Sequence, residues 1–477
     1  MSIPNFLSIH IGKFRLGVIK GGIGIRRFDK PRKNKQPPLG FDTQATRPAK
    51  HRCKEDSSLF FLLMGLKDLL FTARASGLDR HRSYNLPQIH FLSNAIEDLE
   101  LQCYKLELPR SCVKLSSLRK LSLRDVYMDD HTVKNLVCGC PLIEYLEFAS
   151  CHLCEGFKSL ELFGPITLNK IKIVRCQGVE RLDINALNVR FLEIHGSFIS
   201  CKVNIVFCKN LTHLKLSGID IKDEWFYTQI SKLSVLEVLN VSSSNGLKNV
   251  KISNPCLKEL FIVSWWDLVE LNIDTPKLHS LYYVGNMIFL SANALALLEI
   301  SLSFTSKNVE TQRFIELLAN FHHFSEVLNL HINMSEMNVM VPSEVRETIP
   351  SPLSNLEVLN FVSYRTRPTV FKIAKVVDSL LWFAPHTKTI SVDKDECSFE
   401  FTYKKQLIYE GEVVSCCKSL PISCWHHCME AVKVVFKEGS NKIKYTLNGA
   451  GIWDKIVALC EVWQLRKSAG FGLFLVV

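Results

Sequence analysis

A group of thiols and imidazoles near the C-terminus has the side chains that could bind a metal ion. Zinc accepts such ligands in tetrahedral sites, where paired ligands are usually separated by two residues. That spacing is missing here, and two of the cysteines are adjacent. We therefore expect no metal, but buried thiols packed around Trp425. The group consists of Cys416, Cys417, Cys424, His426, His427 and Cys428.

The chain offers no recognisable catalytic motif. The glycines near Lys20 lack the order of a phosphate-binding loop, and neither His-Glu-x-x-His nor Gly-x-Ser-x-Gly occurs. We expect no catalytic residue, no cofactor and no enzymatic activity.

One spacing of apolar residues recurs along much of the chain. An apolar residue is followed by two variable residues, a second apolar residue, one variable residue and a third apolar residue. The last two apolar residues of such a copy share one face of a short strand. Each copy buries little surface alone, so copies must stack on one another. Examples begin at Leu118, Ile143, Leu168, Val179, Val189, Leu211, Leu236, Leu257, Leu268 and Leu278.

The distance between copies predicts two kinds of coil. Starts separated by 22 or 25 residues leave room for a helix, such as the one expected over 130–138. Starts at 168, 179 and 189, and at 247, 257, 268 and 278, leave none, so these coils carry a strand on both sides. The fold class is α/β: an irregular leucine-rich-repeat solenoid with β-rich coils and some helices.

Residues between the buried strand positions should point to an open face, where a protein partner would bind. The paired tryptophans could be an interface hot spot there. Alternatively, at least one of them fills the core, as Tyr283 is expected to do. The partner-binding candidates are Lys120, Arg124, Tyr145, His213, Lys215, Phe261, Trp265, Trp266 and Tyr282.

Seventeen cysteines spread over so long a chain are expected to be reduced, and most of them buried. Cys138 and Cys140 are predicted core residues. Cys151 and Cys176 occupy the position where repeats of this type place Asn or Cys to satisfy backbone groups in the turn.

The positive net charge of +11 is concentrated near the N-terminus. Between Arg26 and Lys54, ten Lys or Arg residues stand against two acids, and four prolines interrupt the segment. We expect a disordered basic tail over 1–55, which is either a nuclear import signal or a solvated tail without a targeting function. The remaining chain is nearly neutral, which disfavours nucleic acid as a partner. No apolar run is long enough to span a membrane, so a cytoplasmic or nuclear protein is expected.

Several segments resemble plant F-box/leucine-rich-repeat proteins with a C-terminal FBD region. The resemblance rests on 84–88, 113–123, 140–146, 342–353, 379–386 and 424–434. It implies a substrate-recognition subunit of a cullin-RING ubiquitin ligase, with repeats over 84–365 and a small α+β FBD-like region over 366–477.

The F-box itself departs from the family pattern. Lys50–Asp56 is similar to its lead-in and Lys67–Phe71 to its closing helix, but only ten residues separate them. The resemblance thus places a degenerate remnant over 56–83, and the Skp adaptor would dock through 55–83. The alternative is a repeat protein that has lost adaptor binding, as a competitor or a pseudogene-like product.

Overall fold

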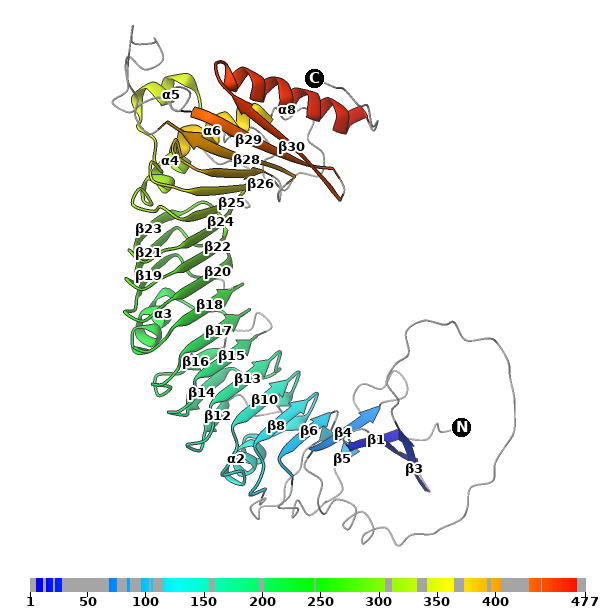
Figure 1. Ribbon diagram of the computed structural model, residues 1–477. Helices are drawn as coiled ribbons and strands as arrows, with labels where there is room; N and C mark the ends of the chain where they lie inside the picture. Colours follow the sequence, from blue (N-terminus) through cyan, green and yellow to red (C-terminus); the bar gives the residue numbers. More distant parts are fainter. Residues whose placement is uncertain are drawn as a thin grey trace, which may run out of the picture. The chain divides into compact units, whose positions relative to one another are not determined.

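The fold consists of two units, Met1–Asp220 (the N-terminal unit) and Ile221–Val477 (the C-terminal unit), and each is described by itself. Figure 1 shows both units in the computed structural model of the chain. It describes residues 6–11, 14–19, 22–27, 68–74, 84–85, 96–102, 104–105, 115–153, 159–196, 201–243, 246–304, 311–332, 341–363, 373–392, 396–404, 429–438 and 440–469.

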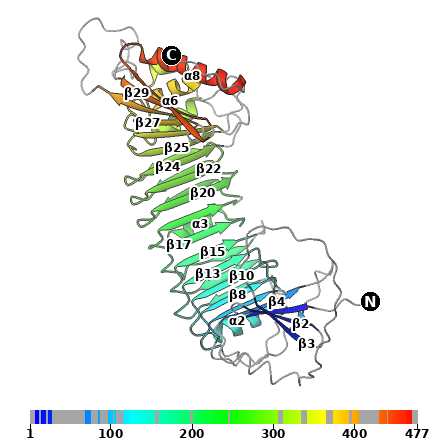
Figure 2. The same ribbon diagram turned by 45° about the vertical axis from the view of Figure 1, so that its right-hand side comes forward.

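The N-terminal unit is built on a parallel sheet with one strand from each coil, as the repeat predicts. Each strand pairs with the next in chain order, and β8, β10, β13 and β15 lie side by side in Figure 2. The strands are β4 (Asp68–Arg74), β6 (Asp98–Gln102), β8 (Lys120–Arg124), β10 (Tyr145–Ala149), β13 (Lys170–Val174), β15 (Phe191–His195) and β17 (His213–Ser217).

The register of these strands aligns equivalent residues of the repeat. Leu121 pairs with Leu99 on one side and with Leu146 on the other. All three apolar positions of a copy are buried; in the copy that begins at Leu118, for example, Leu118, Leu121 and Leu123 are 0% exposed. Burial of this ladder of apolar side chains drives the stacking of coils.

On the side of each coil opposite the main sheet, the N-terminal unit has a helix or a strand, as the spacing of the copies predicts. The longer coil contains α2 (Asp130–Cys138), whose N-cap Asp129 accepts a hydrogen bond from the Thr132 amide at 2.7 Å. Coils with short spacing instead form a second parallel sheet of β12 (Ser159–Phe163), β14 (Arg181–Asn185) and β16 (Lys202–Asn204). A third sheet consists of β5 (Tyr84–Asn85), β7 (Tyr104–Lys105), β9 (Tyr127–Met128) and β11 (His152–Leu153).

Cysteines at the end of the main strands satisfy the backbone of the preceding coil, as predicted. The Cys151 thiol donates to the Leu123 carbonyl at 3.2 Å, and the Cys176 thiol to the Phe148 carbonyl at 3.6 Å. Cys140 is buried as expected, but Cys138 is exposed. The prediction was wrong for Cys138 because the last turn of α2 faces solvent there and the core begins two residues later.

The N-terminal segment differs from the sequence expectation in two places. Within the predicted tail, β1 (Phe6–Ile11), β2 (Phe14–Ile19) and β3 (Gly22–Arg27) form an antiparallel meander, and β1 pairs with β4. The prediction of a closing helix over Lys67–Phe71 was wrong for residues 68–71, because they lie in β4, a strand in register with β6. Residues 28–67, which include most of the basic segment, lie outside the described residues.

The C-terminal unit has the same plan, with main strands that pair in parallel. A second sheet contains β19 (Asn249–Ser253), β21 (Glu270–Asp274) and β23 (Phe289–Asn293), again where the copies are closely spaced. The main strands are β18 (Val238–Ser242), β20 (Glu259–Trp265), β22 (Ser280–Gly285), β24 (Glu299–Phe304), β25 (Val327–Ile332), β26 (Val358–Ser363) and β27 (Thr389–Val392).

The predicted α+β region ends the C-terminal unit. After β27 the sheet becomes antiparallel, through β28 (Cys397–Tyr403), β29 (Met429–Glu438) and β30 (Asn441–Asn448). The helices of this unit are α3 (Asp223–Ile230), α4 (Thr311–Ala319), α5 (Ser343–Thr348), α6 (Ile373–Phe383) and α8 (Ile452–Ala469). None of the helices that the structure describes is long and apolar enough to cross a membrane.

Candidate partner-binding face

The outward side chains of the N-terminal unit's main sheet form three rows, because the strands are paired without register shifts. We call this surface the N-terminal face. Neighbouring strands lie about 4.8 Å apart, so the side chains within a row contact one another. The first row is Asp98, Lys120, Tyr145, Lys170, Phe191 and His213. The second is Glu100, Ser122, Glu147, Lys172, Glu193 and Lys215; the third is Gln102, Arg124, Ala149, Val174, His195 and Ser217.

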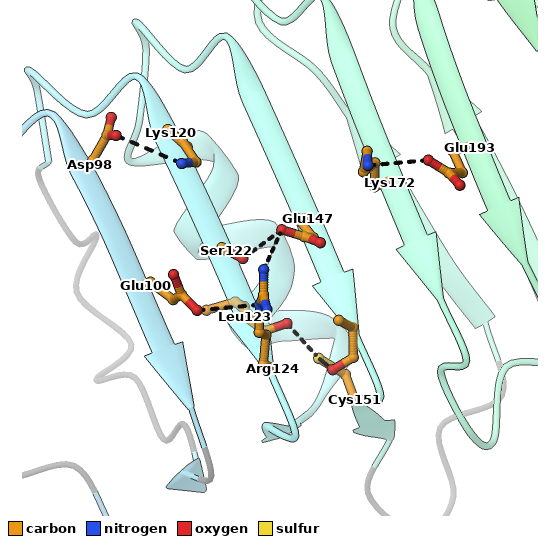
Figure 3. Close-up of polar contacts among 11 residues, drawn as sticks. Asp98, Glu100, Lys120, Ser122, Leu123, Arg124, Glu147, Cys151, Lys172 and Glu193 are labelled. Carbon is orange, nitrogen blue, oxygen red and sulfur yellow. Dashed lines mark hydrogen bonds and ion pairs between the residues drawn. The ribbon is translucent and has the colours of Figure 1, made fainter. Parts of the chain in front are cut away.

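Carboxylates in the second row are held between cations. The Glu193 carboxylate forms ion pairs with Lys172 at 3.2 Å and with Lys215 at 3.1 Å; Figure 3 shows the pair with Lys172. Burial alone would raise the pKa of Glu193, but the hydrogen bonds from the two lysines outweigh it, and the pKa is lowered. Glu193 is therefore ionised at neutral pH and positions both ammonium groups.

Arg124 links two carboxylates at the other end of the N-terminal face. It lies 3.2 Å from Glu100 and 3.4 Å from Glu147, and the Ser122 hydroxyl donates to Glu147 at 2.8 Å (Figure 3). Burial raises the pKa of Glu147, but the Ser122 hydrogen bond and the charge of Arg124 outweigh this effect, so the net shift is downward. Ser122 is buried by this contact, although the sequence pattern places it at an outward position.

Cations and aromatic rings alternate in the first row. The Lys120 ammonium lies 5.8 Å from the Tyr145 ring centroid, and the Lys170 ammonium lies 5.5 Å from the same ring and 4.6 Å from that of Phe191. Such contacts fix long side chains through the ring quadrupole. Burial first, and then Glu147, raises the pKa of Tyr145 to about 12, so its hydroxyl stays protonated.

The C-terminal unit presents a different surface, which we call the C-terminal face. Phe261 and Tyr282 are partners on β20 and β22, and their ring centroids lie 6.0 Å apart. Beyond them Asn329 donates to Ser301 at 2.9 Å, and Asn360 donates to Asn329 at 2.8 Å. Asn329 also donates to the Glu299 carboxylate at 2.7 Å, so this face combines one aromatic pair with a short row of hydrogen-bonded polar side chains.

All the predicted partner-binding residues except Trp265 are at least partly exposed. Lys120, Arg124, Tyr145, His213 and Lys215 meet on the N-terminal face, and Phe261 and Tyr282 meet on the C-terminal face. Trp266 is 48% exposed but lies in the turn after β20, outside the rows.

The prediction of Trp265 as a partner-binding residue was wrong. Its side chain is 0% exposed and packs edge-on against Phe226 of α3, with ring centroids 5.6 Å apart. The register shifts between Val263 and Trp265, and Ser264 has a φ of 59°. This irregularity breaks the alternation of the strand and turns Trp265 inward. The alternative, that one of the two tryptophans fills the core, is confirmed for Trp265.

The sequence also held residues that our prediction missed. Lys170, Lys172, Phe191 and Glu193 are outward residues of copies that the repeat pattern had already located. Aligning the copies by their apolar positions would have placed them in the rows. The cysteine–histidine group over 416–428 lies outside the described residues, and no set of metal-binding side chains occurs among those that the structure does describe.

Stacked parallel strands, apolar ladders and thiols that satisfy the turn backbone together define a leucine-rich-repeat protein. Two family models match it: residues 60–186 match the leucine-rich repeats of the FBD-associated F-box protein At5g56370, and residues 188–344 match the leucine-rich-repeat domain described as At1g61320/AtMIF1. Through these repeats the chain is similar to plant F-box/leucine-rich-repeat proteins.

Individual relatives from Arabidopsis thaliana agree. F-box/FBD/LRR-repeat protein At4g26340 is 27% identical over 229 residues, which cover 46% of this chain and 54% of that protein. F-box/LRR-repeat protein 25 is 29% identical over 119 residues, covering 24% and 45%. Putative F-box/LRR-repeat protein At5g02930 is 28% identical over 122 residues, covering 25% of each chain. The chain thus matches between a quarter and about half of the length of these relatives.

Proposed function

We propose that this chain is a recognition scaffold that binds another protein on the outward faces of its main strands. The observation that carries the proposal is the set of ordered rows on the N-terminal face. Its charged side chains are fixed by ion pairs and ring contacts while they remain partly exposed. Fixing side chains before binding lowers the entropy lost when a partner docks. Tyrosine and arginine, both present in the rows, are enriched at protein interfaces.

The relatives support a more specific role. Their names contain F-box, and proteins of that kind select substrates for ubiquitination by a cullin-RING ligase. We propose that this chain supplies the substrate-recognition part of such a function, without catalytic chemistry of its own. A protein substrate, rather than nucleic acid, is the partner that these faces suit.

A second candidate is a recognition solenoid that does not bind the Skp adaptor. The observation that favours it is β4, because residues 68–72 pair with β6 as a repeat strand. Leu66, Leu69 and Phe71 also have the spacing of the repeat. These residues are therefore no longer proposed as an adaptor-docking helix.

One experiment tests both levels of the proposal. The full chain and a Lys170→Glu/Phe191→Ala variant are expressed in plant cells, purified by affinity tag and compared by quantitative mass spectrometry. A Lys202→Glu/Phe207→Ala variant is the control, because both residues are exposed away from the rows, at β16 and in the turn that follows it. We expect a set of proteins to be lost with the first variant and kept with the control.

The adaptor is measured in the same samples, with a complete F-box/leucine-rich-repeat protein as the positive control. Recovery of the Skp adaptor with both variants supports the ligase role. Recovery of partners without the adaptor favours the second candidate. Identical partner sets for all three forms would contradict recognition through the N-terminal face.

A further inference from the structure

Positive charge is concentrated on one half of the N-terminal face. Across β6, β8 and β10, the rows hold three carboxylates (Asp98, Glu100 and Glu147) and two cations (Lys120 and Arg124). Across β13, β15 and β17, they hold Lys170, Lys172 and Lys215 but only one carboxylate, Glu193. The second half therefore carries an excess of positive charge, which a partner could neutralise.

The lysines of this half keep the capacity to donate hydrogen bonds to a ligand. Glu193 contacts both Lys172 and Lys215, whose side chains remain 28% and 48% exposed. Lys170 has no ion pair with a carboxylate among the described residues and lies between two aromatic rings. A ring orients an ammonium group without satisfying its N–H donors. Each lysine can therefore still donate to an incoming carboxylate.

Phe191 lies between these cations. It is half exposed on β15, with the Lys170 ammonium 4.6 Å from its ring centroid and the His213 ring 6.2 Å away on the other side. A purely ionic ligand would leave this ring in contact with water. A ligand that places an apolar group between two carboxylates would cover the ring and meet the lysines on both sides.

We propose that Lys170, Lys172, Phe191 and Lys215, here called the basic patch, bind an extended acidic segment of the partner protein. This inference rests on the proposed function and specifies its ligand. Strands β13 and β17 are two strands apart, about 10 Å, and an extended chain advances about 3.3 Å per residue. Acidic residues about three positions apart, with an apolar residue between them, would therefore reach Lys170 and Lys215.

Charge distribution favours a peptide over nucleic acid. Glu193 lies inside the basic patch, and its lowered pKa keeps it ionised. A continuous phosphate backbone crossing the patch would meet this negative charge, whereas a peptide can place an uncharged residue beside it. Nucleic acid is therefore an outcome of the test and not the proposal.

The test is fluorescence anisotropy with the purified full chain. The probe is a labelled peptide that repeats Asp-Leu-Glu, compared with a peptide that repeats Asn-Leu-Gln and with a single-stranded oligonucleotide. The variants are Lys170→Gln/Lys215→Gln and, as a control, Lys202→Gln/Lys209→Gln. The control also removes two exposed lysines, so both variants have the same net charge. Thermal unfolding checks that all forms are folded.

We expect the acidic peptide to bind the wild type and the control within about twofold, and to lose at least about tenfold in affinity with the patch variant. The neutral peptide should bind more weakly, and added salt should weaken the acidic one. The proposal is overturned if the acidic and neutral peptides bind equally, if both variants lose affinity equally, or if the oligonucleotide binds tighter than the acidic peptide. If cellular partners still depend on Lys170 and Phe191 while the peptide does not bind, recognition stands and only the acidic ligand fails.

Discussion

Trp265 of β20 packs edge-on against Phe226 of α3, with their ring centroids 5.6 Å apart and both side chains buried. The adjacent Trp266 is 48% exposed. Two neighbouring tryptophans therefore have opposite roles, one holding a helix to the sheet and the other facing solvent. The difference follows from the register shift at Val263 and Trp265, since unbroken alternation would have turned Trp265 outward.

Replacing Trp265 with alanine should therefore destabilise the C-terminal unit strongly. A buried tryptophan that becomes alanine typically costs about 3–5 kcal/mol, because packing is lost and a cavity remains. Trp266→Ala is the matched control and should change the free energy of unfolding by less than about 0.5 kcal/mol. Urea unfolding measures both. Equal destabilisation by the two substitutions would contradict the assigned burial.

Cys151 should contribute to stability through its hydrogen bond and not through redox chemistry. Its buried thiol donates to the Leu123 carbonyl at 3.2 Å, one coil away (Figure 3). Cys151→Ala would leave this carbonyl without its thiol donor, at a cost of about 1–3 kcal/mol. The exposed Cys138→Ala should be nearly neutral. Thermal unfolding of both variants under reducing conditions tests the difference, and a neutral Cys151→Ala would argue against it.

Gly285 should not tolerate a side chain. A Cβ there would lie 2.7 Å from the Tyr283 hydroxyl oxygen, which donates to the Asn286 carbonyl at 2.6 Å. We expect Gly285→Ala to cost about 1–3 kcal/mol, as overpacking of a core does. Tyr283→Phe removes the atom in closest conflict, so the double variant should be less destabilised than the sum of the single variants. Additive effects in the double-mutant cycle would show that the two positions are not coupled.

The pH dependence of stability should reveal the ion pairs of Glu193. Because the folded-state pKa of Glu193 lies below its ordinary value of 4.5, its contribution is present above that pH and is lost as the pH falls through the lower folded value. Water screens this partly exposed group, so the effect should be below about 1 kcal/mol. Unfolding free energies of the wild type and Glu193→Gln, measured from neutral pH downward, should converge in acid. A difference that is constant with pH would contradict the ionised pair.

Much of the fold could be predicted because the repeat encodes strand position and burial together. The copies that begin at Leu168, Val179 and Val189 became β13, β14 and β15, which alternate between the main sheet and the second sheet. Residues 68–71 were misassigned because family resemblance was given more weight than spacing; Leu66, Leu69 and Phe71 fit the repeat. Trp265 could not be placed from alternation, since a bulge and a positive φ at Ser264 reverse its direction. The chemistry of the faces depends on contacts between coils, such as Lys170 with Phe191, which only the register reveals.

The aromatic pair of the C-terminal face gives the last prediction. Phe261 and Tyr282 contact each other at 6.0 Å between ring centroids, and Tyr282 is 37% exposed. Exposed aromatic residues on a rigid strand lose little entropy on binding, and those at an interface centre often contribute about 2 kcal/mol or more. If the recognised partner covers this face, Tyr282→Ala should weaken its binding by roughly thirtyfold. Exposed Phe289→Ala, on β23 of the other sheet, should have no effect. Binding of the partner identified in cells, measured by calorimetry with both variants, distinguishes a partner that covers the C-terminal face from one confined to the N-terminal face.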